Sequence, residues 1–207
     1  MTSLHPTLGQ PGSRRLSVLL LWLTISWNII EGVIAVNSGV AAGSVALIGF
    51  GLDSFIEVTA AGILLWRLGL PDHDVRTERR EATAHRVVGM TFLLLAAYIG
   101  AQAVYTLTLG DEPEVSTVGL VLAGISLAVM PGLGLIKRSN ARKLGSRALI
   151  AESTETLICS YLSLTLFIGL GANAAFGWAW ADVAAALAMV PWIVKEGLEG
   201  LRAEECD

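Results

Sequence analysis

Six acidic residues occupy long apolar segments of this 207-residue chain, where charge is costly. They are Glu31, Asp53, Glu57, Glu152, Glu155 and Asp182. A charged side chain at the centre of a bilayer costs at least about 2.5–3.5 kcal/mol, so acids in such segments usually serve a function. No Lys or Arg is expected deep in the same segments. A metal cation or a proton is therefore the expected partner of these acids.

Two pairs of candidate metal ligands follow helical spacing. Asp53 and Glu57 are four residues apart, as are Glu155 and Cys159, so each pair shares one helix face. At 1.5 Å per residue, Asp53 and Glu155 lie about 20 Å and about 24 Å from the outer ends of their segments, so the pairs can meet near mid-membrane. Three carboxylates and one thiolate suit zinc, manganese or iron. The alternative is that the acids are protonated and join helices, with Cys159 a small core residue.

Further residues are candidates for contacting these ligands: Glu152, Glu31, Asn28 and Asp182. Glu152 precedes Glu155 by three residues and lies on the same broad face. Asn28 and Glu31 are also three apart, and polar contact between helices is the alternative for them. Asp72, His73 and Asp74 are either a second metal site or solvated surface.

The composition defines the elements that must position these residues. Hydrophobic residues make up 54% of the chain and charged residues 15%, whereas a soluble domain carries about a quarter charged residues. This excludes a soluble enzyme and a nucleic-acid binder, and no Walker, HExxH, Gly-x-Ser-x-Gly or dinucleotide motif is present. A spanning helix needs about 20 apolar residues. Six predicted spans meet this need: 15–37, 40–67, 85–109, 115–136, 146–171 and 177–199.

The basic residues predict how the spans are oriented. All 14 Lys and Arg precede the first span, separate the second from the third or the fourth from the fifth, or lie near the carboxyl end. The loops near 38–39, 110–114 and 172–176 contain none. Because positive charge stays on the cytoplasmic side, both termini should be cytoplasmic. The expected organisation is a tail at 1–14, a six-helix domain at 15–200 and a tail at 201–207.

A short internal echo sets the register of the two ligand pairs. Residues 43–48 read Gly-Ser-Val-Ala-Leu-Ile, and residues 145–150 read Gly-Ser-Arg-Ala-Leu-Ile. The same offset relates Asp53 to Glu155 and Glu57 to Cys159. Each segment therefore runs from a small-residue entry to a ligand pair.

These features resemble the cation diffusion facilitator, or cation efflux, family. Residues 43–57 are similar to its second helix, in which a Ser-x-Ala-Leu entry leads to two metal ligands four apart. Residues 146–159 are similar to its fifth helix, with Glu152 and Cys159 at Asp positions of the family motif and Glu155 at the His position. Residues 177–182 resemble the entry to its sixth helix.

The resemblance implies a six-helix, proton-coupled exporter of divalent metal, commonly a homodimer, with its site between helices two and five. Two departures stand out. No His lies inside a span, because His5 and His73 lie outside the spans and His85 lies at the cytoplasmic edge of the third. The chain also ends after the sixth span, so the usual cytoplasmic metal-binding domain is expected to be missing.

The sequence thus predicts an all-α membrane protein that exports divalent metal, most simply across the plasma membrane. Its expected partners are the metal ion, protons, lipid and a second copy of the chain, with no nucleic acid and no tightly bound cofactor. Coupling would be competition between protons and metal for the same oxygens. The alternative is a non-transporting membrane subunit or metal sensor whose acids serve helix packing.

Overall fold

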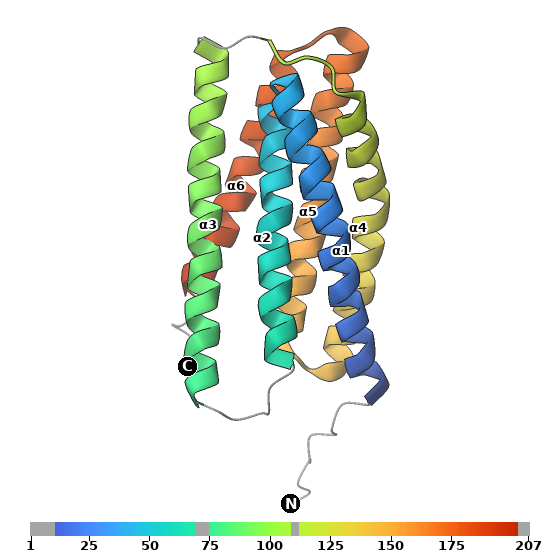
Figure 1. Ribbon diagram of the computed structural model, residues 1–207, viewed down its shortest axis with the longest axis vertical. Coiled ribbons are helices and arrows are strands. Elements are labelled where there is room, and N and C mark those ends of the chain that lie inside the picture. Colours follow the sequence, from blue (N-terminus) through green and yellow to red (C-terminus); the bar gives the residue numbers. More distant parts are fainter. Residues whose placement is uncertain (1–10, 69–74, 109–111, 203–207) are drawn as a thin grey trace, which may run out of the picture.

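The computed structural model describes residues 11–68, 75–108 and 112–202, and the regular structure in these ranges is entirely α-helical. Successive helices alternate in direction along one bundle (Figure 1). Their bounds are Pro11–Ala42 (α1), Val45–Leu68 (α2), Val75–Thr108 (α3), Thr117–Leu144 (α4), Arg147–Phe176 (α5) and Trp180–Arg202 (α6). The expected six-helix, all-α architecture is confirmed.

Several helices extend further than the apolar segments that predicted them. The fourth was expected to end at residue 136 but continues to Leu144, and the third was expected to begin at residue 85 but begins at Val75. Those limits were wrong because they were placed where charged residues begin. Lys and Arg are compatible with a helix, since their long stems follow the apolar surface while the charge reaches water.

Two helix junctions share one local structure, and they coincide with the internal echo. Gly43 and Gly145 have φ values of 64° and 63°, which glycine adopts without steric penalty. The following serine caps the next helix: Ser44 Oγ accepts from Leu47 N at 3.1 Å, and Ser146 Oγ accepts from Leu149 N at 3.4 Å. The echo therefore specifies matching starts for α2 and α5, at opposite ends of the bundle (Figure 1).

Three helix pairs form the most extensive packing, namely α1 with α2, α4 with α5 and α3 with α6. The first two pairs join through contacts of α1 with α4 and of α2 with α5, and α3 and α6 lie alongside (Figure 1). Helix α2 touches α1, α3, α5 and α6. Residues on α2 are therefore placed at the centre of the bundle.

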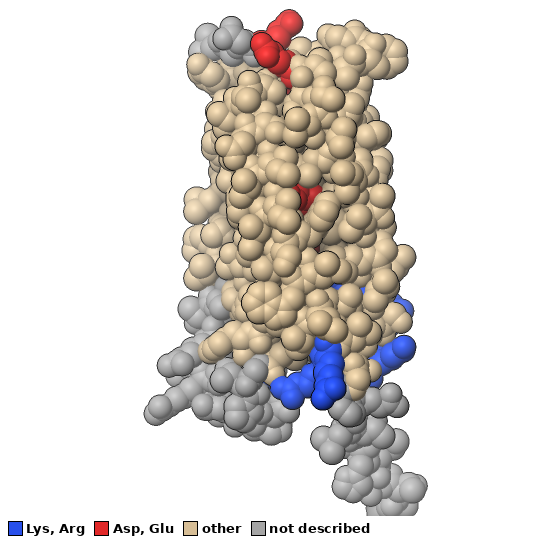
Figure 2. Space-filling view, turned by 45° about the vertical axis from the view of Figure 1, so that its right-hand side comes forward, with Lys and Arg blue, Asp and Glu red and all other residues tan. Residues whose placement is uncertain are grey.

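The bundle surface is suited to lipid. Five of the helices in the described residues, α1 to α5, are long and apolar enough to cross a membrane. Helix α6 is too rich in charge to meet the same criterion, because Asp182 lies near its start and Lys195, Glu196 and Glu199 near its end. In Figure 2 almost the whole side of the bundle is formed by uncharged residues, and Lys and Arg gather at one end.

Candidate metal-transport site

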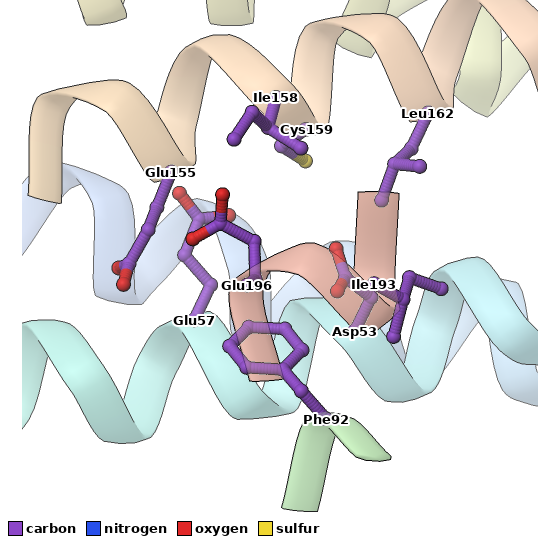
Figure 3. Close-up of a pocket in the computed structure, with 9 residues that line it drawn as sticks. All are labelled: Asp53, Glu57, Phe92, Glu155, Ile158, Cys159, Leu162, Ile193 and Glu196. Carbon is purple, nitrogen blue, oxygen red and sulfur yellow. The ribbon is translucent and has the colours of Figure 1, made fainter. Parts of the chain in front are cut away.

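The two predicted ligand pairs line one cavity inside the bundle. Asp53 and Glu57 reach it from α2, and Glu155 and Cys159 from α5 (Figure 3). Asp53, Glu57 and Cys159 are buried, and Glu155 is partly buried. The cavity volume is about 20 Å³, which is room for about one water-sized particle.

Antiparallel helices determine which of these residues face each other. Along α2 the chain passes Asp53 before Glu57, whereas α5 runs the other way and passes Glu155 before Cys159. Figure 3 accordingly places Glu155 and Glu57 toward one end of the cavity and Cys159 and Asp53 toward the other. Within the part of the chain that the structure describes, no three His, Cys, Asp or Glu side chains cluster closely enough to hold a metal ion. The predicted ligands therefore line one cavity but lie at two different positions along it, one toward each end.

The cavity is lined by five further residues, none of them among the predicted site residues: Phe92, Ile158, Leu162, Ile193 and Glu196. Glu196 enters from α6 and Phe92 from α3 (Figure 3). A signal for Glu196 was present, because it continues the helical spacing of the buried residues Met189 and Ile193. It lies between Lys195 and Glu199, near the end of the last predicted span.

A buried lysine corrects the expectation that no cation lies among the acids. Lys137 was assigned to a cytoplasmic loop, but it lies within α4 and is 4% exposed. Its ammonium forms an ion pair with Glu152 and donates to Thr156 Oγ1 at 2.7 Å. Thr156 in turn donates to Glu57 Oε1 at 3.0 Å. Glu152 is therefore not an unpaired acid, and it is joined to the cavity through Lys137 and Thr156.

Glu31 lies in a separate polar cluster formed by residues of α1, α2 and α4. Its carboxylate accepts from Ser54 at 3.1 Å, from the Trp27 indole at 3.3 Å and from Ser126 of α4. Neighbouring Asn28 is fully buried, and both polar atoms of its amide lack a hydrogen-bond partner within the described ranges. Neither Asn28 nor Glu31 lines the cavity.

Asp182 caps the start of α2. Its carboxylate accepts from the Ser44 hydroxyl at 2.5 Å, from Val45 N at 2.9 Å and from Ala46 N at 3.4 Å. The first backbone amides of a helix have no partner within the helix, and an anion there is stabilised by the helix dipole. Asp182 thus fixes α2 to α6 and does not line the cavity. The candidate second site at Asp72, His73 and Asp74 lies outside the described residues.

The fold and the site together define a class of protein: an integral membrane protein with acidic side chains enclosed among apolar helices. Residues 21–203 match the model of the cation efflux transmembrane domain. The chain belongs to the cation efflux family, as its resemblance to that family predicted. The members of this family are cation transporters and not enzymes.

One curated relative extends the comparison. The chain is 27% identical over 155 residues to transmembrane protein 163 of Xenopus laevis. The aligned region covers 75% of this chain and 55% of the relative, so the chain spans about half the length of that protein.

Proposed function

We propose that this chain exports a divalent transition-metal cation of the zinc, manganese or iron class, in exchange for protons, through the cavity between α2 and α5. The observation that carries the proposal is that Asp53, Glu57, Glu155 and Cys159, named from residue type and spacing, line one buried cavity. The proposal includes a homodimer in the plasma membrane.

The donor chemistry supports a transition metal. Carboxylate oxygens bind zinc, manganese and iron, and a thiolate favours the softer ions. Because the four groups lie at two levels, they must close on an arriving ion by turning about their side-chain bonds. Glu196 supplies a further carboxylate at the same cavity.

Proton coupling follows from competition at the same atoms. A carboxylate that binds a proton loses part of its capacity to bind metal, and metal binding releases protons. We expect metal to enter from the cytoplasm and displace protons, and protons to return from the other side and release it. Both steps use Asp53, Glu57 and Glu155.

A second function, that of a non-transporting subunit or sensor, is favoured by the internal partners of three acids. Glu31, Glu152 and Asp182 are all held by hydrogen bonds or an ion pair between helices. The same explanation does not extend to Asp53 and Glu155, for which no hydrogen bond or ion pair is found within the described residues.

Flux measurements separate these functions. Purified protein is placed in liposomes that contain a metal-sensitive dye, and Zn²⁺, Mn²⁺ or Fe²⁺ is added under an imposed pH gradient. We expect flux of at least one ion, dependent on the gradient. Asp53→Asn should lower that flux by at least about a hundredfold because an ion ligand is lost.

The control is Glu114→Gln, which neutralises an exposed acid far from the cavity and should leave the flux unchanged. Unchanged flux in Asp53→Asn would mean that the site is misassigned. If none of the ions moves, the transport proposal fails and the sensor remains.

A further inference from the structure

Lys137 is a buried cation whose hydrogen bonds lead to the proposed site. It lies on α4, seven residues before the end of the helix, and faces α5. Its partners are the Glu152 carboxylate and the Thr156 hydroxyl. A buried ion pair adds little net stability over apolar residues of the same size, so stability alone does not explain its presence.

Thr156 passes this interaction on to Glu57. Its Oγ1 accepts from Lys137 at 2.7 Å, and it has two acceptors for its single proton. These are Glu57 Oε1 at 3.0 Å and the Glu152 carbonyl oxygen at 3.3 Å. The Glu57 carboxylate is closer, and hydrogen bonds to charged acceptors are stronger, so Thr156 donates its hydrogen bond to Glu57. The donors therefore run in one direction, from Lys137 through Thr156 to Glu57.

The two oxygens of Glu57 are left in different states. Oε1 accepts from Thr156, whereas Oε2 is buried and lacks a hydrogen-bond partner within the described part of the chain. A buried polar atom without a partner is costly, and a bound ion is one way in which it is satisfied. Glu57 lines the cavity, and Oε2 is the oxygen of its carboxylate that remains available to an ion there.

We propose that Lys137 and Thr156 are positioning residues for the transported cation. They hold Glu57 by one carboxylate oxygen so that the other is presented to the ion. This inference rests on the proposed function, and it names how that site is oriented. Partners of this kind fix the orientation of metal-binding groups, and their loss typically weakens metal affinity about 10- to 100-fold.

Counting charges alone gives a different expectation. Lys137 and Glu152 neutralise each other, so replacing both by neutral residues leaves the net charge near the cavity unchanged. Metal affinity would then stay the same. If Lys137 acts by orienting Thr156, the same replacement must weaken binding.

The test is Zn²⁺ and Mn²⁺ binding to the purified full chain, measured by titration calorimetry alongside the thermal unfolding midpoint. Thr156→Val removes the hydroxyl at nearly constant shape and leaves the Lys137–Glu152 pair intact. Thr156→Ser keeps the hydroxyl and is its matched control. We expect Thr156→Val to bind about 10- to 100-fold more weakly and Thr156→Ser to bind like the parent.

The second test is the double variant Lys137→Gln with Glu152→Gln, called the pair variant. It is used instead of Lys137→Gln alone because an unpaired buried Glu152 would cost about 3–5 kcal/mol and could prevent folding. We expect it to bind more weakly as well. Adding Thr156→Val to the pair variant should cause little further loss of metal affinity, since the effects of substitutions at contacting residues do not add.

Parent-like affinity in either Thr156→Val or the pair variant overturns the inference and leaves the proposed function intact. If the parent itself binds neither ion, the proposed function fails first. A fall in the unfolding midpoint without a fall in affinity assigns these residues to folding alone, which also overturns the inference.

Discussion

Glu57 and Glu155 share one end of the cavity, and Asp53 and Cys159 share the other. This arrangement gives the two levels different chemistry: two carboxylates at one, and a carboxylate with a thiol at the other. Hard ions such as Mn²⁺ prefer oxygen ligands, whereas zinc accepts both oxygen and sulfur. Under the proposed function, an ion bound beside Asp53 and Cys159 would therefore be selected by its affinity for sulfur.

Exchanging the sulfur of Cys159 for oxygen should change which metal is preferred. Cys159→Ser keeps the size of the side chain and removes the soft ligand, so the ratio of Zn²⁺ to Mn²⁺ affinity should fall by about tenfold or more. Cys206→Ser, which removes the other cysteine of the chain, is the control and should leave the ratio unchanged. An unaltered ratio in Cys159→Ser would remove the sulfur from the ion's ligands.

Spacing along one helix predicted the members of each pair but not all residues around the cavity. Residues four apart share a face whatever the fold, which is why Asp53 with Glu57, and Glu155 with Cys159, could be named in advance. Lys137 and Glu196 lie near helix ends, where a long charged side chain can turn either to solvent or into the bundle. Which of these two directions the side chain takes depends on how the helix is rotated about its axis. That rotation is set by packing against neighbouring helices.

At the scale of helices, the position of α6 decides whether Glu196 reaches the cavity. Helices α3 and α6 meet at two glycines: a Cβ placed on Gly89 would lie 2.8 Å from the carbonyl oxygen of Gly197. Contact of backbone with backbone leaves no side chain that could move aside. Because Gly197 directly follows Glu196, the close approach of the two helices also places that carboxylate.

We therefore expect Gly89→Ala to push α6 outward. Overpacking of this kind costs about 1–3 kcal/mol, so the thermal unfolding midpoint in detergent should fall. Metal flux should fall with it as Glu196 withdraws. The matched control on the same helix is Gly100→Ala, where a Cβ would meet nothing within 4 Å. If both variants unfold at the same temperature, the glycine contact does not hold α3 to α6.

For the molecule as a whole, the number of spans was predictable because it depends on composition summed over long segments. Six apolar runs became six helices, and five of them meet the length and hydropathy expected of a span. Helix limits were less predictable, since Lys137 and Arg138 continue α4 as a regular helix past the apolar run. Hydropathy reports where lipid ends, whereas backbone hydrogen bonding continues until a capping residue such as Gly145 stops it.

The distribution of charge over the bundle predicts its orientation in the membrane. Lys and Arg gather at the end where α4 ends and α5 begins, and acidic side chains lie at the opposite end (Figure 2). Basic residues are retained in the cytoplasm. The side of the cavity nearer to Lys137 should therefore be the side from which metal enters.

Cysteine labelling on intact cells tests this orientation. In a Cys206→Ser background, the remaining Cys159 is buried and should not react with a membrane-impermeant maleimide. Glu114→Cys and Arg142→Cys each add one exposed thiol, at opposite ends of the bundle. We expect Glu114→Cys to label at once and Arg142→Cys only after the membrane is permeabilised. The reverse pattern would place the basic end outside, and the proposed direction of export would have to be inverted with it.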